Sequence, residues 1–410
     1  MNDQNKMNIV ITGHVDHGKS SLIGRVLFDT GSIPETMVEE IRKISQERGE
    51  EMQFAYFLDA LEEERTQNIT IDTTQTFFKT SHRSYVIIDA PGHREFLKNM
   101  VSGASLADAA VLIVDISRGI EEQTRRHANI LKLLGLTDVI VAVNKMDMVN
   151  YEEAKFNAIT QEIKDFFVKL KLTPKRMIPI SAKTGENILK PSANLSWYKG
   201  FTLLQELDAL EEPVSLSTKD TRVSIQGIFP QKGEDVLLAR VESGEVKTGD
   251  TFDVYPGNSK VSVKTIKNGF DQPKSANSGQ SIGLVLSDKS SITRGAVLSR
   301  GATPHQTSEL RTTIFSMTEK AIPTGKEFTL KCGTQEVKGR IKKVYSRIDS
   351  STLEVKTEHS NQLEGTEVGD VDLVTDSPVV FENFSSVPSL GRIVLVENDE
   401  ILAAGIINHA

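Results

Sequence analysis

The sequence has little of what marks secreted or membrane-embedded proteins. Its 410 residues include a single cysteine, Cys332, which excludes an internal disulfide framework and a zinc or iron–sulfur site built on cysteines. The longest apolar runs, such as residues 109–114 and 139–143, are too short to span a bilayer. The polar residues 1–6 lack the apolar core of a signal peptide. These absences predict a cytoplasmic protein with no membrane partner.

An excess of basic residues is also missing. The formal net charge is -8, so the composition gives no overall sign of nucleic-acid binding, although a local basic face can exist within an acidic total. Apolar residues make up 38% of the chain and charged residues 25%, which is ordinary for a globular protein. The length allows two or three domains with sizeable cores.

A glycine-punctuated stretch near the N-terminus is the strongest local signal. Residues 13–20 read G-H-V-D-H-G-K-S, follow the apolar run 9–11 and precede a helical pattern from Ser21. Strand, loop and helix in this order form the context of a phosphate-binding loop, and a chance Gly-rich turn is the weaker alternative. The predicted nucleotide contacts in this stretch are Gly13, His14, Val15, Asp16, His17, Gly18, Lys19, Ser20 and Ser21.

Each residue type in this loop has a chemical reason to be there. Gly13 and Gly18 let the backbone turn so that its N–H groups converge on phosphate oxygens. The N-terminus of the following helix adds partial positive charge. Lys19 places a cation on the outer phosphates, and Ser20 offers a hydroxyl to Mg²⁺.

The same loop contains residue types that ligate metals. His14, Asp16 and His17 lie inside a segment whose backbone is committed to phosphate, so a transition-metal site is the weaker interpretation. Asp16 is a hypothetical ligand of a monovalent cation near the phosphates.

Residues 8–212 alternate strand-like apolar runs with helical patterns. This βαβ rhythm predicts an α/β P-loop domain with a mostly parallel, doubly wound sheet. In such sheets ligands bind at the carboxyl ends of the strands, where the phosphate loop, Asp89, Asn144 and Ser181 should converge. The predicted strands are residues 8–12, 75–79, 85–89, 109–114, 139–144 and 177–180.

Two further stretches carry groups that can sense the third phosphate. Thr70 follows the long insertion 31–68, and its hydroxyl can complete Mg²⁺ coordination. In the run D-A-P-G-H, Asp89 can hold Mg²⁺ through water, Gly92 can donate a backbone N–H to the γ-phosphate, and His93 can orient the attacking water. The predicted catalytic residues are His93, Lys19 and Thr70, and the predicted Mg²⁺ ligands are Ser20, Thr70 and Asp89.

Two more strand ends carry residues suited to a guanine base. The carboxylate of Asp147 can accept the N1–H and 2-amino groups, which adenine lacks, and such a mismatch discriminates by roughly 10⁴-fold. Lys145 can lie across the base plane, and Asn144 can tie this loop to the phosphate loop. The backbone of the S-A-K run can contact O6. The predicted base contacts are Asn144, Lys145, Asp147, Ser181, Ala182 and Lys183, and the set predicts GTP as the ligand.

The second half of the chain has a different pattern. The run E-E-P at 211–213 ends a helix and marks a linker, and from Thr221 short alternating segments indicate small all-β barrels. The run R-G-A-T-P marks a second boundary. The predicted domains are a GTP-binding domain over residues 1–212 and two β-barrels over residues 213–305 and 306–410.

Together these motifs resemble those of the translation-factor GTPases. The quoted runs are G-H-V-D-H-G-K-S, I-T-I-D, D-A-P-G-H, N-K-M-D and S-A-K. The resemblance covers nearly the whole chain, because this family has a GTPase domain followed by two β-barrels. It implies GTP hydrolysis with Mg²⁺, and an apolar gate formed by Val15 and Ile69 beside His93.

Two branches of the family compete. Residues 123–127 and 197–200 resemble the GTPase subunit of bacterial sulfate adenylyltransferase, which implies coupling of GTP hydrolysis to adenylyl sulfate synthesis from ATP and sulfate by a separate catalytic small subunit. Residues 30–35 and 92–96 resemble elongation factor 1α, which implies delivery of aminoacyl-tRNA to the ribosome. The first branch is the leading expectation, as a heterodimer or larger assembly, and tRNA is the partner under the alternative.

Overall fold

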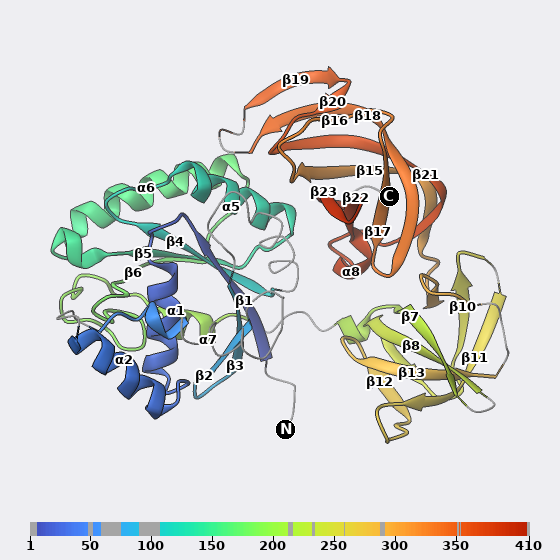
Figure 1. The fold of residues 1–410 in the computed structure, drawn as a ribbon, viewed down its shortest axis with the longest axis horizontal. Helices are drawn as coiled ribbons and strands as arrows, with labels where there is room; N and C mark the ends of the chain where they lie inside the picture. Colours follow the sequence, from blue (N-terminus) through green and yellow to red (C-terminus); the bar gives the residue numbers. More distant parts are fainter. Residues whose placement is uncertain are drawn as a thin grey trace. The chain divides into compact units, whose positions relative to one another are not determined.

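The fold consists of a sheet-and-helix unit and a unit made of strands. The computed structural model describes residues 6–47, 52–58, 75–89, 107–211, 216–231, 234–257, 259–287, 292–350, 352 and 354–407. The chain divides into two compact units, Met1–Pro213 with Ser350–Leu353, and Val214–Asp349 with Glu354–Ala410 (Figure 1). The finer division into three domains at residues 212 and 305 stays a prediction.

The first unit contains a six-stranded sheet in the order β2-β3-β1-β4-β5-β6. All neighbouring strands are parallel except β2 and β3, which are antiparallel because the turn 80–83 is too short for a crossover. The mostly parallel sheet and its six predicted strands are confirmed. The strands are β1 (Lys6–Gly13), β2 (Gln75–Lys79), β3 (Ser84–Asp89), β4 (Ala109–Asp115), β5 (Val139–Asn144) and β6 (Arg176–Pro179).

Helices cover both faces of this sheet. Every residue of β4 and β5 is buried, as expected for parallel strands packed on two sides. Figure 1 shows α5 and α6 on the side opposite to α1 and α2. None of the helices in the described ranges is long and apolar enough to cross a membrane. The helices are α1 (Lys19–Asp29), α2 (Glu35–Glu47), α5 (Glu122–Leu133), α6 (Glu153–Lys169) and α7 (Leu203–Asp208), with the 3₁₀ turn η3 (Met146–Val149).

The second unit begins with a closed six-stranded barrel. Alternate residues point inward, so that Val261 and Val263 of β11 join its core. The alternation of buried and exposed residues in β11 is visible in the sequence. The strands are β7 (Thr221–Gln231), β8 (Glu234–Ser243), β10 (Thr251–Tyr255), β11 (Ser259–Lys267), β13 (Ser281–Leu286) and β14 (Val297–Arg300), beside the small pair β9 (Glu245–Lys247) and β12 (Ser275–Asn277).

A second barrel completes this unit. Its sheet runs β17-β22-β23-β15-β21-β18-β19, and an extra pairing of β17 with β18 closes six of these strands into a ring. The expected architecture, an α/β domain followed by two β-barrels, is therefore confirmed. The strands are β15 (His305–Ser316), β17 (Glu327–Cys332), β18 (Gln335–Asp349), β19 (Val355–Ser360), β21 (Glu367–Phe381), β22 (Arg392–Glu397) and β23 (Glu400–Ile407), with the short elements β16 (Ile322–Pro323), β20 (Gln362–Leu363), α8 (Pro388–Gly391) and η4 (Leu216–Thr218).

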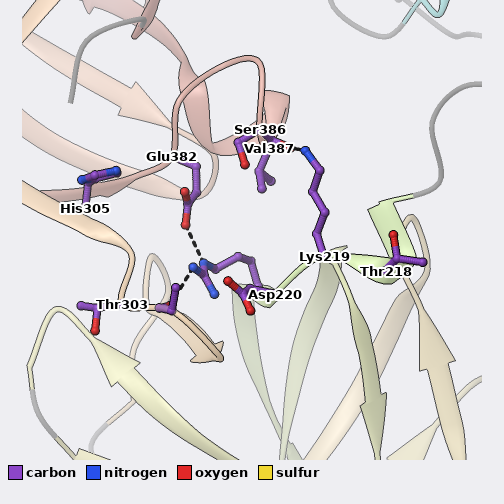
Figure 2. A pocket seen from close by; sticks show the side chains of 10 residues that line it. Thr218, Lys219, Asp220, Thr303, His305, Glu382, Ser386 and Val387 are labelled. Atoms are coloured by element: carbon purple, nitrogen blue, oxygen red, sulfur yellow. Dashed lines mark hydrogen bonds and ion pairs between the residues drawn. The ribbon is translucent and has the colours of Figure 1, made fainter.

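A buried arginine joins the two barrels. Arg222 donates from Nε to Oε1 of Glu382 at 2.7 Å, from Nη1 to Ser299 Oγ and from Nη2 to the carbonyl of Ala302. Arg222, Ala302 and Glu382 line a polar cavity of about 450 Å³. Figure 2 shows Glu382 in this cavity, with Lys219 and Ser386. Each nitrogen of the guanidinium has an acceptor, so Arg222 has a structural role between the two barrels.

Candidate functional site: the nucleotide-binding edge of the first unit

The phosphate loop joins β1 to α1, and two of its glycines are required by geometry. Gly18 has φ of +91°, and a Cβ there would lie 2.4 Å from Nδ2 of Asn144. A Cβ at Gly13 would lie 2.4 Å from Cγ2 of Ile113. Gly18 is also the N-cap of α1 and supplies no side-chain cap, so the N–H groups of the first turn remain available to an anion.

The predicted phosphate and magnesium groups lie together at the end of β1 and β3. Nζ of Lys19, the first residue of α1, is 2.9 Å from Oδ1 of Asp89, the last residue of β3. Both side chains are largely buried. An ammonium and a carboxylate beside a phosphate loop fit a magnesium–phosphate ligand, because the carboxylate suits the cation and the ammonium suits the phosphate.

His17, a buried residue of the phosphate loop, is hydrogen-bonded to Glu121 and to the backbone of Asp115. Its Nε2 lies 2.8 Å from Oε2 of Glu121, and because a carboxylate accepts, Nε2 must donate. The N–H of Asp115 can then donate to Nδ1 at 3.3 Å. Burial lowers the pKa of His17, so the ring is neutral with its proton on Nε2. Glu121 was missed by the sequence reasoning, because nothing in its local sequence points to His17.

The loop histidines and this glutamate form a cluster that resembles a metal site. Ligand atoms of His14, His17 and Glu121 all lie within 4.8 Å of one another. However, Nδ1 of His14 is 2.8 Å from the carbonyl of Val15, to which it must donate, and Nε2 of His17 donates to Glu121. With protons on these two nitrogens, the three side chains form a hydrogen-bonded cluster. The preference against a transition metal stays a prediction.

Asn144 bonds to the phosphate loop, as expected for its own N-K-M-D loop, and also to the S-A-K loop, which was not predicted. At the end of β5, its Nδ2 donates to the carbonyl of His17 at 2.8 Å. Its Oδ1 accepts the N–H of Ala182 at 2.9 Å. Asn144 is buried, so one amide group holds both loops in a defined relation.

Asp147 and Ser181 are also brought together. Ser181 Oγ donates to Oδ1 of Asp147 at 2.6 Å and accepts the N–H of Thr184 at 3.2 Å. Asp147 lies in η3, where it is half-buried. The carboxylate is therefore held in one orientation before any base is present.

A buried aspartate that the sequence reasoning missed holds Lys145. Nζ of Lys145 lies 2.8 Å from Oδ2 of Asp115, whose side chain is 1% exposed. The other oxygen, Oδ1, accepts from the N–H and Oγ of Ser117. Burial would raise the pKa of Asp115, but hydrogen bonds from Lys145 and Ser117 outweigh it and lower the pKa. The only local signal was an aspartate at the end of a buried strand.

The remaining predicted residues lie in α1 or outside the described residues. Ser20 and Ser21 lie in the first turn of α1. Thr70, Gly92 and His93, together with the gate residue Ile69, lie outside the described residues.

The structure has a phosphate loop on a mostly parallel sheet and an N-K-M-D loop whose Asn144 bonds both to that loop and to the S-A-K loop. Two β-barrels follow later in the chain, and this combination defines a multidomain P-loop GTPase. Comparison with known families shows which family of P-loop GTPases the chain belongs to. Residues 4–213 match the model described as the elongation factor Tu GTP binding domain, and residues 309–408 match the GTP-eEF1A C-terminal domain-like model. The chain belongs to the translation-factor GTPase family of elongation factors Tu and 1-alpha.

Individual relatives extend the match over nearly the whole chain. Elongation factor 1-alpha of Thermococcus celer is 36% identical over 415 residues, covering 98% of this chain and 97% of the relative. That of Pyrococcus furiosus is 36% identical over 419 residues, covering 99% and 98%. A solved structure of sup35 complexed with GDP is 24% identical and covers 100% of this chain and 95% of its own, with a TM-score of 0.46. The family's GTPase domain implies that this protein uses GTP with Mg²⁺ and hydrolyses it.

Proposed function

We propose that this chain is an elongation-factor-like GTPase that delivers aminoacyl-tRNA to the ribosome in the cytoplasm. The observation that carries the proposal is the 36% identity to elongation factor 1-alpha over 98% of the chain, which includes both barrels as well as the nucleotide domain. The match of residues 309–408 to an eEF1A C-terminal model supports the same choice.

The leading expectation from short motifs, a GTPase subunit of sulfate adenylyltransferase, gains no support from these relatives. One of the stretches behind it has a role inside the fold. Trp197 donates from Nε1 to the carbonyl of Tyr151 at 2.9 Å, and its ring packs 5.3 Å from that of Phe156. A run such as 197–200 can therefore be explained by packing within the nucleotide domain, without a catalytic partner subunit.

In this proposal the nucleotide spans the edge already described. Residues 13–21 would bind the phosphates, with Lys19 on the outer phosphates and Asp89 holding Mg²⁺ through water in place of their present contact with each other. Asp147 accepts the N1–H and 2-amino groups of guanine, and the loop 181–183 meets O6. Ser20 and Thr70 complete the magnesium ligands.

Hydrolysis proceeds by in-line attack of water on the γ-phosphorus, with breakage of the bond to the bridging oxygen. His93 orients the attacking water, and Lys19 stabilises negative charge on the transferred group. Loss of the γ-phosphate removes the contacts proposed for Thr70 and Gly92, and this change releases the aminoacyl-tRNA.

The decisive experiment compares the full chain loaded with GTP or with GDP. We expect the GTP form to bind aminoacyl-tRNA and to protect its ester bond from hydrolysis, whereas the GDP form and uncharged tRNA should show neither effect. Equal protection in both nucleotide states would contradict delivery. Stimulation of GTP hydrolysis by a sulfate-adenylylating subunit, without tRNA binding, would restore the sulfate interpretation.

A further inference from the structure

Arg25 lies on α1, outside every nucleotide motif, yet its side chain reaches the loop that follows β6. Its Nε donates to the carbonyl of Ala182 at 3.2 Å, and its Nη2 donates to the carbonyl of Lys183. The two carbonyls belong to adjacent residues, so the planar guanidinium spans two successive peptide groups. Such a fork is something that arginine offers and lysine does not.

The guanidinium is itself held from three sides. Nη1 lies 3.7 Å from Oδ1 of Asp29, one helical turn further along α1. The centre of the guanidinium is 3.5 Å from the ring centroid of Phe54, a cation–π distance. At Gly185, where φ is +81°, a Cβ would lie 3.1 Å from Nη1. The side chain is 12% exposed, so its position is fixed by packing.

Peptide geometry carries this restraint to the base pocket. In a trans peptide the C=O of one residue and the N–H of the next point in opposite directions. Holding the carbonyl of Ala182 therefore aims the N–H of Lys183 away from Arg25. Holding the carbonyl of Lys183 likewise aims the N–H of Thr184, which donates to Ser181 Oγ at 3.2 Å.

The restraint on the carbonyl of Lys183 reaches the carboxylate that is proposed to recognise guanine. Ser181 Oγ donates to Oδ1 of Asp147 at 2.6 Å, so the hydroxyl that receives the N–H of Thr184 also orients Asp147. Arg25 thus restrains both parts of the proposed base site indirectly. These parts are the backbone N–H groups available to O6 and the carboxylate that would accept N1–H and the 2-amino group. Asn144 bonds the same loop from the other side, through the N–H of Ala182.

We propose that Arg25 is a positioning residue for guanine recognition, which it performs by fixing the peptide planes after Ala182 and Lys183. The proposal rests on the proposed base site. It predicts that Arg25 affects the discrimination between bases, whereas a residue that only stabilised the fold would lower the unfolding temperature and leave discrimination unchanged.

The test uses the full chain and the variant Arg25→Met, which keeps an apolar stem and removes the donors. Affinity is measured for GDP, for inosine diphosphate, which lacks the 2-amino group, and for 2,6-diaminopurine riboside diphosphate, which has an amino group in place of O6 and lacks N1–H. Loss of two charge-assisted hydrogen bonds should weaken GDP binding about 10- to 100-fold. The preference for GDP over both analogues should fall about tenfold. Arg25→Lys, which restores the charge but not the fork, should recover part of the affinity and little of the discrimination.

Arg42→Met serves as the matched control, because Arg42 is an exposed arginine on α2. Unfolding temperatures of all variants establish that they fold. If Arg25→Met does not fold, the comparison is made with Arg25→Lys. An unchanged ratio of GDP to analogue affinity in a folded Arg25 variant overturns the positioning role. If the unmodified protein shows no preference for GDP over the analogues, the base site itself is wrong, which separates the two failures.

Discussion

In the proposed nucleotide site, the hydrogen bonds that orient Asp147 at the base end differ in kind from the ion pair between Lys19 and Asp89 at the phosphate end. At the base end, hydrogen bonds set the geometry in advance: Asn144 bonds two loops, and Ser181 orients Asp147. At the phosphate end, Lys19 and Asp89 pair with each other. A charged pair of this kind can exchange its partners for a phosphate and a cation. Under the proposed assignments, the carboxylate that reads the base is oriented before the ligand binds, whereas Lys19 and Asp89 exchange partners when it binds.

The most direct way to break the base end is Asp147→Asn. The amide can still accept from Ser181, but it can no longer accept both guanine donors, and its NH₂ can donate to the 2-oxo group of xanthine. We expect the preference to shift from GTP to xanthosine triphosphate by about 10³- to 10⁴-fold, measured by competition binding. Asp165→Asn, at an exposed position of α6, is the control. Tight GTP binding by Asp147→Asn would refute the assigned role.

At the phosphate end, His93→Ala should separate chemistry from binding. Loss of a group that orients the water should slow single-turnover hydrolysis about 10²-fold or more and leave GTP affinity unchanged. The matched control is His82→Ala, since His82 is an exposed histidine between β2 and β3. Hydrolysis at the rate of the unmodified protein would exclude His93 from the reaction.

Asp115→Asn tests whether nucleotide binding needs the ion pair that positions Lys145. The amide keeps an acceptor for Ser117, but the ion pair with Lys145 is lost. Lys145 is 29% exposed and can turn to solvent, so we expect a moderate effect: about a 5- to 10-fold loss of GDP affinity and about 1 to 2 kcal/mol of unfolding free energy. Ser117→Ala removes the neighbouring hydrogen bond without touching the ion pair. Similar losses in both variants would show that the hydrogen bonds of Asp115 matter and its charge does not.

The smallest effect should be a pH dependence of the unfolding free energy that comes from His17, a buried residue of the phosphate loop. Burial lowers the pKa of His17 from its ordinary 6.5, so the unfolded chain binds more protons than the folded one as the pH falls below that value. The contribution is fully present above pH 6.5 and is lost as the pH falls toward the folded pKa. His17→Gln should therefore show a shallower fall in unfolding free energy between neutral and mildly acidic pH, measured by denaturant titration. An identical slope in both proteins would contradict a neutral buried His17.

The sequence predicts the parts of this molecule that depend on local patterns. Glycine spacing at 13 and 18 and the apolar runs of β1, β4 and β5 are sufficient to place the phosphate loop and the sheet. Motif residues at strand ends converge because parallel strands share one edge. The residues that hold these motifs in place were missed because their partners are distant in sequence. Glu121 bonds to a residue 104 positions away, and Arg25 to one 157 positions away. No local periodicity encodes such a pair.

The amide of Asn144 has a consequence for how a ligand leaves. One side chain bonds to the carbonyl behind the phosphates and to the N–H behind the base, so neither loop can relax while the other stays in register. Both hydrogen bonds are present without a ligand, so neither has to break when a nucleotide leaves. The two loops should therefore keep their relative position after release, and the next nucleotide should meet a site that is already arranged.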